Sequence, residues 1–282
     1  MDKQYASLLA VIFIVSSLFY ACDDKKDKKT GALEFDKILL NESAHLFGDT
    51  AKPACKLMID YKYVVKSSNE QLKDSINMLL TTATLGDKYM ADEPNEAIKN
   101  YAETYISEYL HDLEPMYLED RKDKENAASI SSWYSYYRAI ETDIKFYERD
   151  LLVYYISYNE YTGGAHGMYM TNFLNIDLKN MHQIVLDDLF IENYSEALTD
   201  LLWNQLMMDN KVTTRDELED LGYGLTGDLG PTENFYLNKD GITFHYNVYE
   251  FTPYVMGATE IRLPFSMVSH LLKSHPIISQ LK

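Results

Sequence analysis

Cysteine and positive charge are both scarce in this 282-residue chain. Two cysteines, Cys22 and Cys55, cannot form the disulfide framework that holds small secreted domains together. Lysine and arginine number 26 against 44 aspartates and glutamates, so the formal net charge is −18. Proteins that bind nucleic acid need a basic surface, and proteins held on anionic lipid need a basic patch. The composition therefore argues against both classes of protein.

Low-complexity tracts and long apolar runs are also lacking. Hydrophobic residues make up 46% of the chain and charged residues 25%, which is typical of a soluble globular protein with a substantial core. The aromatic residues are unevenly divided, with 24 tyrosines against 11 phenylalanines and 2 tryptophans. Tyrosine has an apolar face and a polar hydroxyl, so it suits both half-buried sheets and exposed recognition surfaces.

Residues 1–21 predict a lipoprotein signal peptide. Lys3 precedes an apolar run from Leu8 to Val15, which is shorter than the roughly 20 residues that a membrane span needs. The segment ends in Ala21-Cys22, and a small residue before cysteine is typical of the site where lipoproteins are cleaved and acylated. We therefore expect lipidation at Cys22. The alternative is an ordinary signal peptide or an uncleaved anchor, because Phe19 and Tyr20 are bulkier than the usual residues there.

A charged segment at 22–34 predicts a solvated tether, because it cannot bury apolar area. Its acidic start, Asp23-Asp24, resembles surface-export signals of some Gram-negative lipoproteins. We expect a bacterial envelope protein that is lipid-anchored in the outer membrane and exposed at the surface. Lipidation of Cys22 leaves Cys55 without an intramolecular partner. We interpret Cys55 as a small buried hydrophobic residue, with a reactive thiol or an interchain disulfide as alternatives.

The remaining pattern predicts an α+β fold of mixed, mostly antiparallel sheets with packed helices, in two associated halves at 35–172 and 173–282. Alternating apolar residues indicate strands at 56–66, 132–147, 151–161 and 168–176. In the second strand, Tyr136, Ile140, Ile144 and Phe146 are expected to share one face. Helical spacing indicates one helix at 70–80 and another that begins after Asp92 and ends at Pro115.

The C-terminal half combines short helices with a hairpin. We expect Asn193 or Ser195 to cap one helix, and the Thr214–Glu217 spacing to form a capping box for a second that ends at Gly222. The Asp-Gly pair at 240–241 predicts a hairpin over 234–246. A strand at 260–263 and a helix at 265–272 follow. The adjacent carboxylates at 187–188 suit a helix start better than acid–base catalysis.

Three segments carry a family resemblance: Tyr161-Thr-Gly-Gly-Ala-His-Gly167, Ile184-Val-Leu-Asp-Asp-Leu-Phe190, and Phe235–Tyr246 followed by Tyr249-Glu-Phe-Thr-Pro-Tyr254 and Gly257. Over about residues 35–275 the chain resembles the paired extracytoplasmic domains of RsiV-type anti-sigma factors and PdaC-type peptidoglycan deacetylases. In the first group this region binds lysozyme, and in the second it accompanies a separate catalytic domain. The resemblance therefore implies an envelope location and the binding of a protein or glycan. Neither sigma-factor control nor deacetylation is carried over.

The predicted site lies in two loops. Gly163 and Gly164 surround a bend that could present His166 to a ligand, although the same glycines suit a tight turn in which His166 binds nearby backbone. Asn247, Tyr249 and Tyr254 follow the hairpin. In a strand, Asn247 and Tyr249 would lie on one face and could contact a ligand. The alternative is that Tyr249 and Tyr254 belong to the sheet core. We expect the two loops to form one ligand-binding patch.

No catalytic residue, metal site or cofactor is assigned. The histidines lack metal-ligand spacing, and the chain has no nucleophile elbow, P-loop or dinucleotide-binding fingerprint. The leading hypothesis is an ectodomain that binds a basic, lysozyme-like protein, to which the acidic chain would be attracted. The alternative is a peptidoglycan or glycan-binding module, which the abundant tyrosines favour. An unrecognised hydrolase is a third, weaker hypothesis, and nucleic acid is not expected as a partner.

Overall fold

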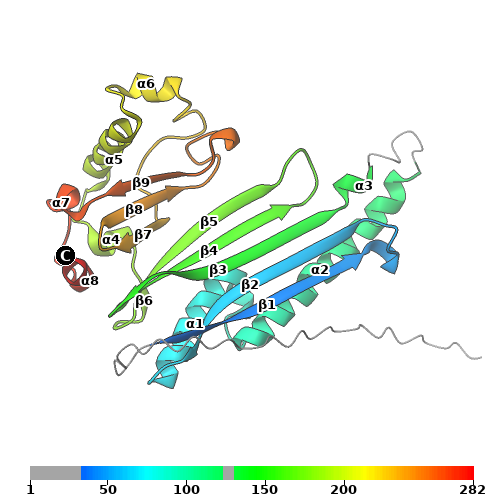
Figure 1. The fold of residues 1–282 in the computed structure, drawn as a ribbon. Helices are drawn as coiled ribbons and strands as arrows, with labels where there is room; N and C mark the ends of the chain where they lie inside the picture. The colour runs from blue at the N-terminus through cyan, green and yellow to red at the C-terminus, as the bar shows by residue number, and fades with distance from the viewer. Residues whose placement is uncertain (1–32, 123–129) are drawn as a thin grey trace, which may run out of the picture.

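The structure is a computed structural model that describes residues 33–122 and 130–282. A six-stranded sheet has the order β1-β2-β3-β4-β5-β6, and a three-stranded sheet has the order β7-β8-β9 (Figure 1). The strands are β1 Glu34–His45, β2 Ala54–Lys66, β3 Tyr136–Glu148, β4 Leu151–Tyr161, β5 Met168–Asp177, β6 His182–Gln183, β7 Phe235–Asn238, β8 Gly241–Tyr246 and β9 Thr259–Leu263.

Helices lie in several of the connections between these strands and after the last strand, β9. They are α1 Glu70–Leu85, α2 Pro94–Asp120, α3 Ile130–Trp133, α4 Leu186–Leu189, α5 Ser195–Asn210, α6 Arg215–Asp220, α7 Phe265–Val268 and α8 Pro276–Leu281, with 3₁₀ turns η1 Leu46–Gly48, η2 Asp87–Tyr89 and η3 Tyr254–Met256. Strands β2 and β3 are parallel, and the other paired neighbours are antiparallel. The predicted α+β class in two associated halves is confirmed. Within the described ranges, none of the helices combines the length and apolar character needed to cross a bilayer.

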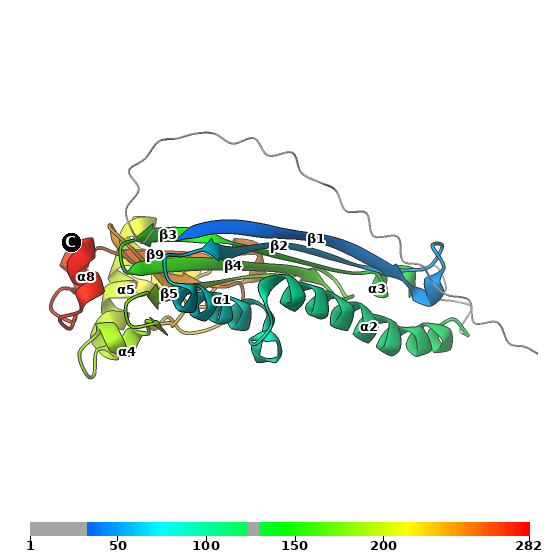
Figure 2. The ribbon, with the colours of Figure 1, turned by 90° about the horizontal axis from the view of Figure 1, so that it is seen from below.

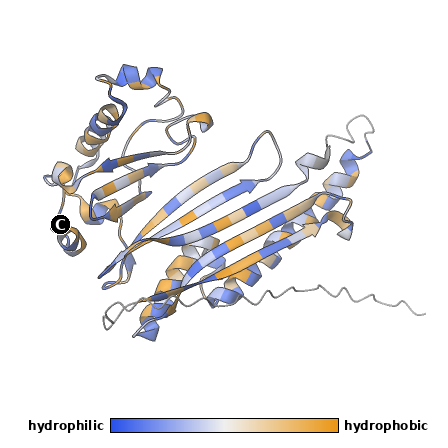
Figure 3. Ribbon diagram, viewed as in Figure 1, coloured by the Kyte–Doolittle hydropathy of each residue, from blue (hydrophilic) through white to orange (hydrophobic). Residues whose placement is uncertain are grey.

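Helices α1 and α2 lie along one face of the six-stranded sheet, as Figure 2 shows. The residues that face them alternate along the strands and form one apolar core, which includes Ile59, Tyr61, Ile140 and Tyr154. Figure 3 shows this alternation of hydrophobic and hydrophilic residues along the strands. Cys55 is a fully buried free thiol in a smaller cluster at the end of the sheet, which confirms its interpretation as a core residue.

The three-stranded sheet and the C-terminal helices form a second core beside β5 (Figure 1). Strand β4 belongs to both cores, because Leu151 and Val153 face the C-terminal half while Leu152 and Tyr154 face α1 and α2. Strand β5 is divided in the same way. The predicted boundary at 172–173 falls inside this shared strand, so the two halves are continuous through the large sheet.

Several strand predictions need correction. Strand β1 was not foreseen, and residues 132–135 do not belong to β3. A bulge between Ile144 and Phe146 breaks the expected alternation, so Phe146 packs in the C-terminal core while Ile144 packs against the helical layer. The signal peptide and Cys22 lie outside the described residues. Leu33, assigned to the tether from the sequence, is buried in the fold.

Helix boundaries also differ from the predicted ones. Helix α2 continues through Pro115 to Asp120, because Leu113 and Tyr117 on either side of the proline are buried in the cluster around Cys55. It begins after Glu93, one residue later than expected. Helix α5 begins after Tyr194 without a side-chain cap, and α7 ends at Val268. The predicted capping box of Thr214 and Glu217 is confirmed at α6.

Candidate functional site

The loop between β4 and β5 presents His166 at the surface. Gly163 and Gly164 have φ angles of 87° and 100°, a region that residues with side chains rarely adopt. A Cβ atom on Gly163 would lie 2.7 Å from the carbonyl oxygen of Trp133, so a side chain there would collide with backbone. The glycines therefore fix the bend. His166 is held locally by its Nδ1, which lies 2.9 Å from the carbonyl oxygen of Gly167.

The loop between β8 and β9 supplies two tyrosines that contact His166. The ring of Tyr254 stacks on the imidazole with a centroid distance of 4.3 Å and an interplanar angle of 25°. The hydroxyl of Tyr249 lies 3.2 Å from His166 Nε2. Tyr249 is 43% exposed, and Tyr169 of β5 adds a further ring 5.6 Å from that of Tyr254. We call His166, Tyr169, Tyr249 and Tyr254 the aromatic patch.

The two predicted loops thus lie together, but Asn247 has a different place from the expected one. Strand β8 ends at Tyr246, and Asn247 begins a turn in which Tyr249 has a φ angle of 70°. Asn247 is only 6% exposed, and its Oδ1 accepts a hydrogen bond of 2.7 Å from the backbone N–H of Thr171. Asn247 therefore joins the turn after β8 to β5, whereas Tyr249 and Tyr254 lie outside the sheet core.

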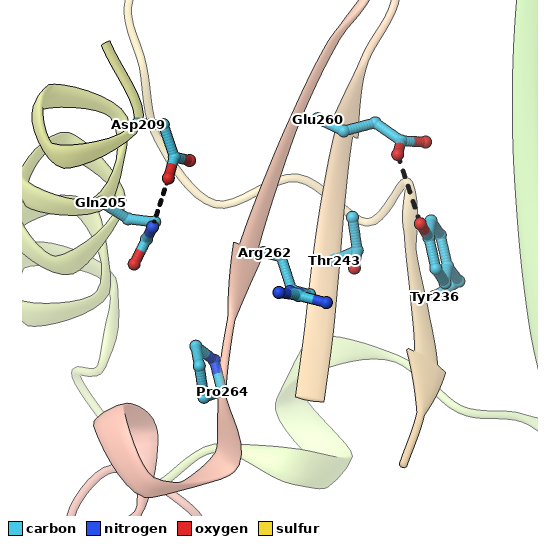
Figure 4. Close-up of a pocket in the computed structure, with 7 residues that line it drawn as sticks. All are labelled: Gln205, Asp209, Tyr236, Thr243, Glu260, Arg262 and Pro264. Atoms are coloured by element: carbon cyan, nitrogen blue, oxygen red, sulfur yellow. Dashed lines mark hydrogen bonds between the residues drawn. The ribbon is translucent and has the colours of Figure 1, made fainter. Parts of the chain in front are cut away.

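A second candidate site lies on the polar face of the three-stranded sheet, as Figure 4 shows. It is a pocket of about 360 Å³ between this face and helix α5. Its lining residues are Gln205, Asp209, Tyr236, Thr243, Glu260, Arg262 and Pro264. We call it the polar trough. This pocket was not predicted from the sequence, although polar residues at alternate positions of β8 and β9 indicate a sheet with a polar second face.

The carboxylate of Glu260 is fixed by two hydrogen bonds. The ring Nδ1 of His245 lies 3.1 Å from Oε1, and the hydroxyl of Tyr236 donates to Oε2 at 3.2 Å. The hydrogen bond from His245 lowers the pKa of Glu260 below its ordinary value, with a further contribution from the charge of Lys145. The other ring nitrogen of His245 lies 3.3 Å from Asn247 Oδ1.

Most shifted pKa values among the tyrosines reflect burial in the sheet. Burial raises the pKa of Tyr158 to about 12, and its hydroxyl donates to the carbonyl oxygen of Thr84. Tyr154 is fully buried and donates to Thr142. These tyrosines pack between strands and helices, so they are not part of a contact surface. In the part of the chain that the structure describes, no three His, Cys, Asp or Glu side chains converge as a metal site.

Comparisons with known proteins match both halves of the chain. Residues 187–266 match the family described as "Protein of unknown function (DUF3298)", and residues 50–169 match the family described as "Deacetylase PdaC". No curated protein matches the chain. These matches fit the resemblance found in the sequence, and they indicate an extracellular or envelope domain of unknown function.

Two solved structures share this architecture. A DUF3298 family protein from Pseudomonas aeruginosa PAO1 has 15% sequence identity and a TM-score of 0.61, covering 87% of this chain and 96% of its own, which shows a shared fold. A member of the DUF3298 family from Bacteroides fragilis NCTC 9343 has a TM-score of 0.87 and covers 99% of its own length. This chain is 60% identical to that protein, and the match covers 90% of this chain. This chain therefore belongs to the DUF3298 family.

Proposed function

We propose that this chain is a lipid-anchored envelope protein whose ectodomain binds a basic, lysozyme-type protein at the aromatic patch. The observation that carries the proposal is the convergence of His166 and Tyr254 from loops in different halves of the chain. Stacked, partly exposed aromatic side chains on a rigid scaffold are typical of the anchors of protein interfaces. The neighbouring Val255 is 90% exposed, so the patch continues into an apolar surface that a partner can cover.

Charge near the aromatic patch supports a basic partner. The segment 216–233 contains six aspartates and glutamates and no lysine or arginine. It borders the patch, because a Cβ atom on Gly222 would lie 2.6 Å from the Sδ atom of Met256. An apolar surface with an acidic border attracts a positively charged protein and raises its rate of association.

The position of the first described residue fits an anchor at Cys22. The backbone N–H of Leu33 donates to the hydroxyl of Tyr147, at the end of the sheet where β3 turns into β4. The His166 loop lies at the other end of β4, whose 11 residues span roughly 35 Å. The chain would therefore leave its anchor at one end of the sheet and present the aromatic patch at the opposite end.

A peptidoglycan or glycan ligand is the second candidate. The stacked rings of His166, Tyr249 and Tyr254 offer apolar faces of the kind against which sugar rings can pack. This alternative shares the patch with the first candidate but does not require the acidic border. It therefore predicts binding that is insensitive to salt.

The test is a binding experiment with the full chain in detergent. A basic lysozyme and insoluble peptidoglycan are the two probes. The binding of each is measured with wild type and with Tyr254→Ala. We expect saturable lysozyme binding that Tyr254→Ala weakens by at least about tenfold, as is usual for an interface anchor. The variant Tyr63→Ala, in a half-buried tyrosine of β2 far from the patch, is the control. Peptidoglycan binding without lysozyme binding would favour the glycan alternative, and the absence of both would reject the proposal.

A further inference from the structure

The polar trough has an arrangement of charges that the aromatic patch does not use. Its floor is formed by Thr243 and Arg262, which are neighbours on adjacent strands β8 and β9. Carboxylates lie on its two sides, with Glu260 on the same face of β9 and Asp209 on α5 (Figure 4). One guanidinium thus lies between two carboxylates in a pocket of about 360 Å³, near the lower end of the usual size range of small-molecule sites.

These charged groups retain hydrogen-bonding capacity. Among the described residues, the ion pair of Arg262 is with Asp240 at 3.7 Å, which is longer than a hydrogen bond. Glu260 accepts one hydrogen bond on each oxygen, although a carboxylate can accept about four. On α5, Gln205 donates to one oxygen of Asp209, which leaves the second oxygen for another donor. The trough therefore has both donors and acceptors to offer a ligand.

The fixed position of Glu260 makes the trough a preformed site. His245 and Tyr236, which hold its carboxylate, are themselves buried against Phe173 of β5. The hydrogen bond from His245 lowers the pKa of Glu260, so its carboxylate is ionised at neutral pH. A fixed anionic group beside an exposed guanidinium can bind a ligand of both charges without reorganising the sheet.

We propose that the polar trough binds a small zwitterion with an ammonium and a carboxylate group, of the size of an amino acid or a dipeptide. Arg262 receives the carboxylate, because a guanidinium matches a carboxylate with two parallel hydrogen bonds. Glu260 and Asp209 receive the ammonium group. The hydroxyl of Thr243 and the amide of Gln205 lie where they can bind the peptide group of a dipeptide. This site is independent of the proposed protein ligand.

Calorimetric titration of the full chain in detergent tests the assignment with four probes. Alanyl-alanine carries both charges, N-acetyl-alanine carries the carboxylate alone, and alaninamide carries the ammonium alone. N-acetylglucosamine represents a saccharide. We expect saturable binding of alanyl-alanine, and binding of each singly charged probe weaker by at least about tenfold, because each loses one charge-assisted contact.

Two variants identify the groups responsible. Arg262→Gln should weaken the binding of alanyl-alanine by at least about tenfold, since the carboxylate then has no partner. Alanyl-alanine should then bind no more tightly than alaninamide. Arg215→Gln removes an exposed arginine of α6, which pairs with Asp200 outside the trough, and is the matched control. Circular dichroism establishes that both variants are folded. Three results would each overturn the assignment: equal binding of all probes, unchanged binding of alanyl-alanine by Arg262→Gln, or binding of N-acetylglucosamine alone.

Discussion

The side-chain amide of Asn175 on β5 joins the two sheets by forming hydrogen bonds with the backbone of β7 at Leu237, as a neighbouring strand would. Its Oδ1 accepts from the backbone N–H of Leu237 at 2.9 Å, and its Nδ2 donates to the carbonyl oxygen of Phe235 at 2.7 Å. Asn234 makes a similar pair of bonds to the backbone of Thr171 and Phe173. Side-chain amides therefore satisfy backbone groups of both β5 and β7, which places the three-stranded sheet at a fixed position beside the large one.

Asn175→Ala should destabilise the fold strongly. The substitution leaves a buried N–H and a buried carbonyl without partners, so we expect a loss of about 2–4 kcal/mol in the free energy of unfolding. Urea denaturation followed by circular dichroism measures this change. Asn204→Ala, in an exposed residue of α5, is the matched control and should change the stability by less than about 0.5 kcal/mol. Equal effects of the two variants would show that the amide pair does not hold the sheets together.

The sequence predicted the core strands well because their periodicity reflects burial on one face. Strand β2 alternates cleanly, and the structure buries Leu57, Ile59 and Tyr61 accordingly. Strand β1 lacks this signal, because it is an edge strand and Leu39 on its open face is 66% exposed. The bulge before Phe146 is also invisible in the sequence, because one extra residue reverses the faces without changing the composition.

The candidate sites differ in how far the sequence could reveal them. The glycines around His166 and the tyrosines near Pro253 are unusual enough to mark two loops, and the structure brings these loops together. The burial of Asn247 depends on the turn after β8, which the sequence pattern does not specify. The polar trough needs Arg262 and Asp209 from separate elements to meet, and such a meeting requires the tertiary structure.

Substitutions in the glycine loop should separate its structural and binding roles. Gly163→Ala should cost about 2 kcal/mol or more, because the new Cβ combines an unfavourable φ with a clash against Trp133. Gly164→Ala should cost roughly 1 kcal/mol, since no atom lies within 4 Å of its Cβ position. Gly164→Val should cost more than His166→Ala, because a β-branched residue tolerates positive φ poorly.

Thermal unfolding measures these differences, and His166→Ala is the comparison that decides the role of the histidine. We expect this variant to keep nearly the wild-type melting temperature, because His166 is exposed. A loss of stability equal to that of Gly163→Ala would show that His166 mainly supports the loop. Unchanged stability with weakened ligand binding would identify His166 as a contact residue.

Cys22→Ala tests the proposed lipid anchor. Acylation of this cysteine would supply the chains that hold the protein at the membrane, so the variant should move from the membrane fraction to the soluble fraction. Fractionation of cells followed by immunoblotting measures the distribution. Cys55→Ala is the control, because this buried thiol has no access to lipid. Retention of Cys22→Ala in the membrane fraction would contradict lipidation at this position.

Glu260 should contribute stability that depends on pH. Its pKa is lower in the folded protein than the ordinary value of 4.5, chiefly because of the hydrogen bond from His245. A lowered pKa means that the unfolded chain binds the proton more readily than the folded chain. The stabilisation is therefore fully present above about pH 5.5 and disappears as the pH falls through the folded-state pKa.

Urea unfolding of wild type and Glu260→Gln at several pH values measures this contribution. Wild type should be the more stable protein at pH 7, and the difference should shrink between pH 5 and pH 3. Glu103→Gln, in an exposed residue of α2, should show little difference at either pH. If the difference in stability between wild type and Glu260→Gln stays constant with pH, packing and not charge accounts for the effect of the substitution.

The acidic border of the aromatic patch should control how fast a basic protein associates. Glu219→Gln combined with Asp220→Asn removes two exposed charges beside Gly222, and we expect the association rate constant for lysozyme to fall roughly threefold at low salt. Screening acts over about 8 Å at physiological ionic strength, so raising the salt should slow wild type toward the rate of the variant. The dissociation rate should change little, because these carboxylates lie beside the contact.

Glu103→Gln combined with Glu108→Gln is the matched control, since it changes the net charge equally from exposed positions on α2. Surface plasmon resonance at two salt concentrations separates the two rate constants. Equal slowing by both double variants would mean that total charge, and not its position, attracts the partner. Tight binding of lysozyme that does not depend on salt would support lysozyme as the ligand but would exclude electrostatic steering by the segment 216–233.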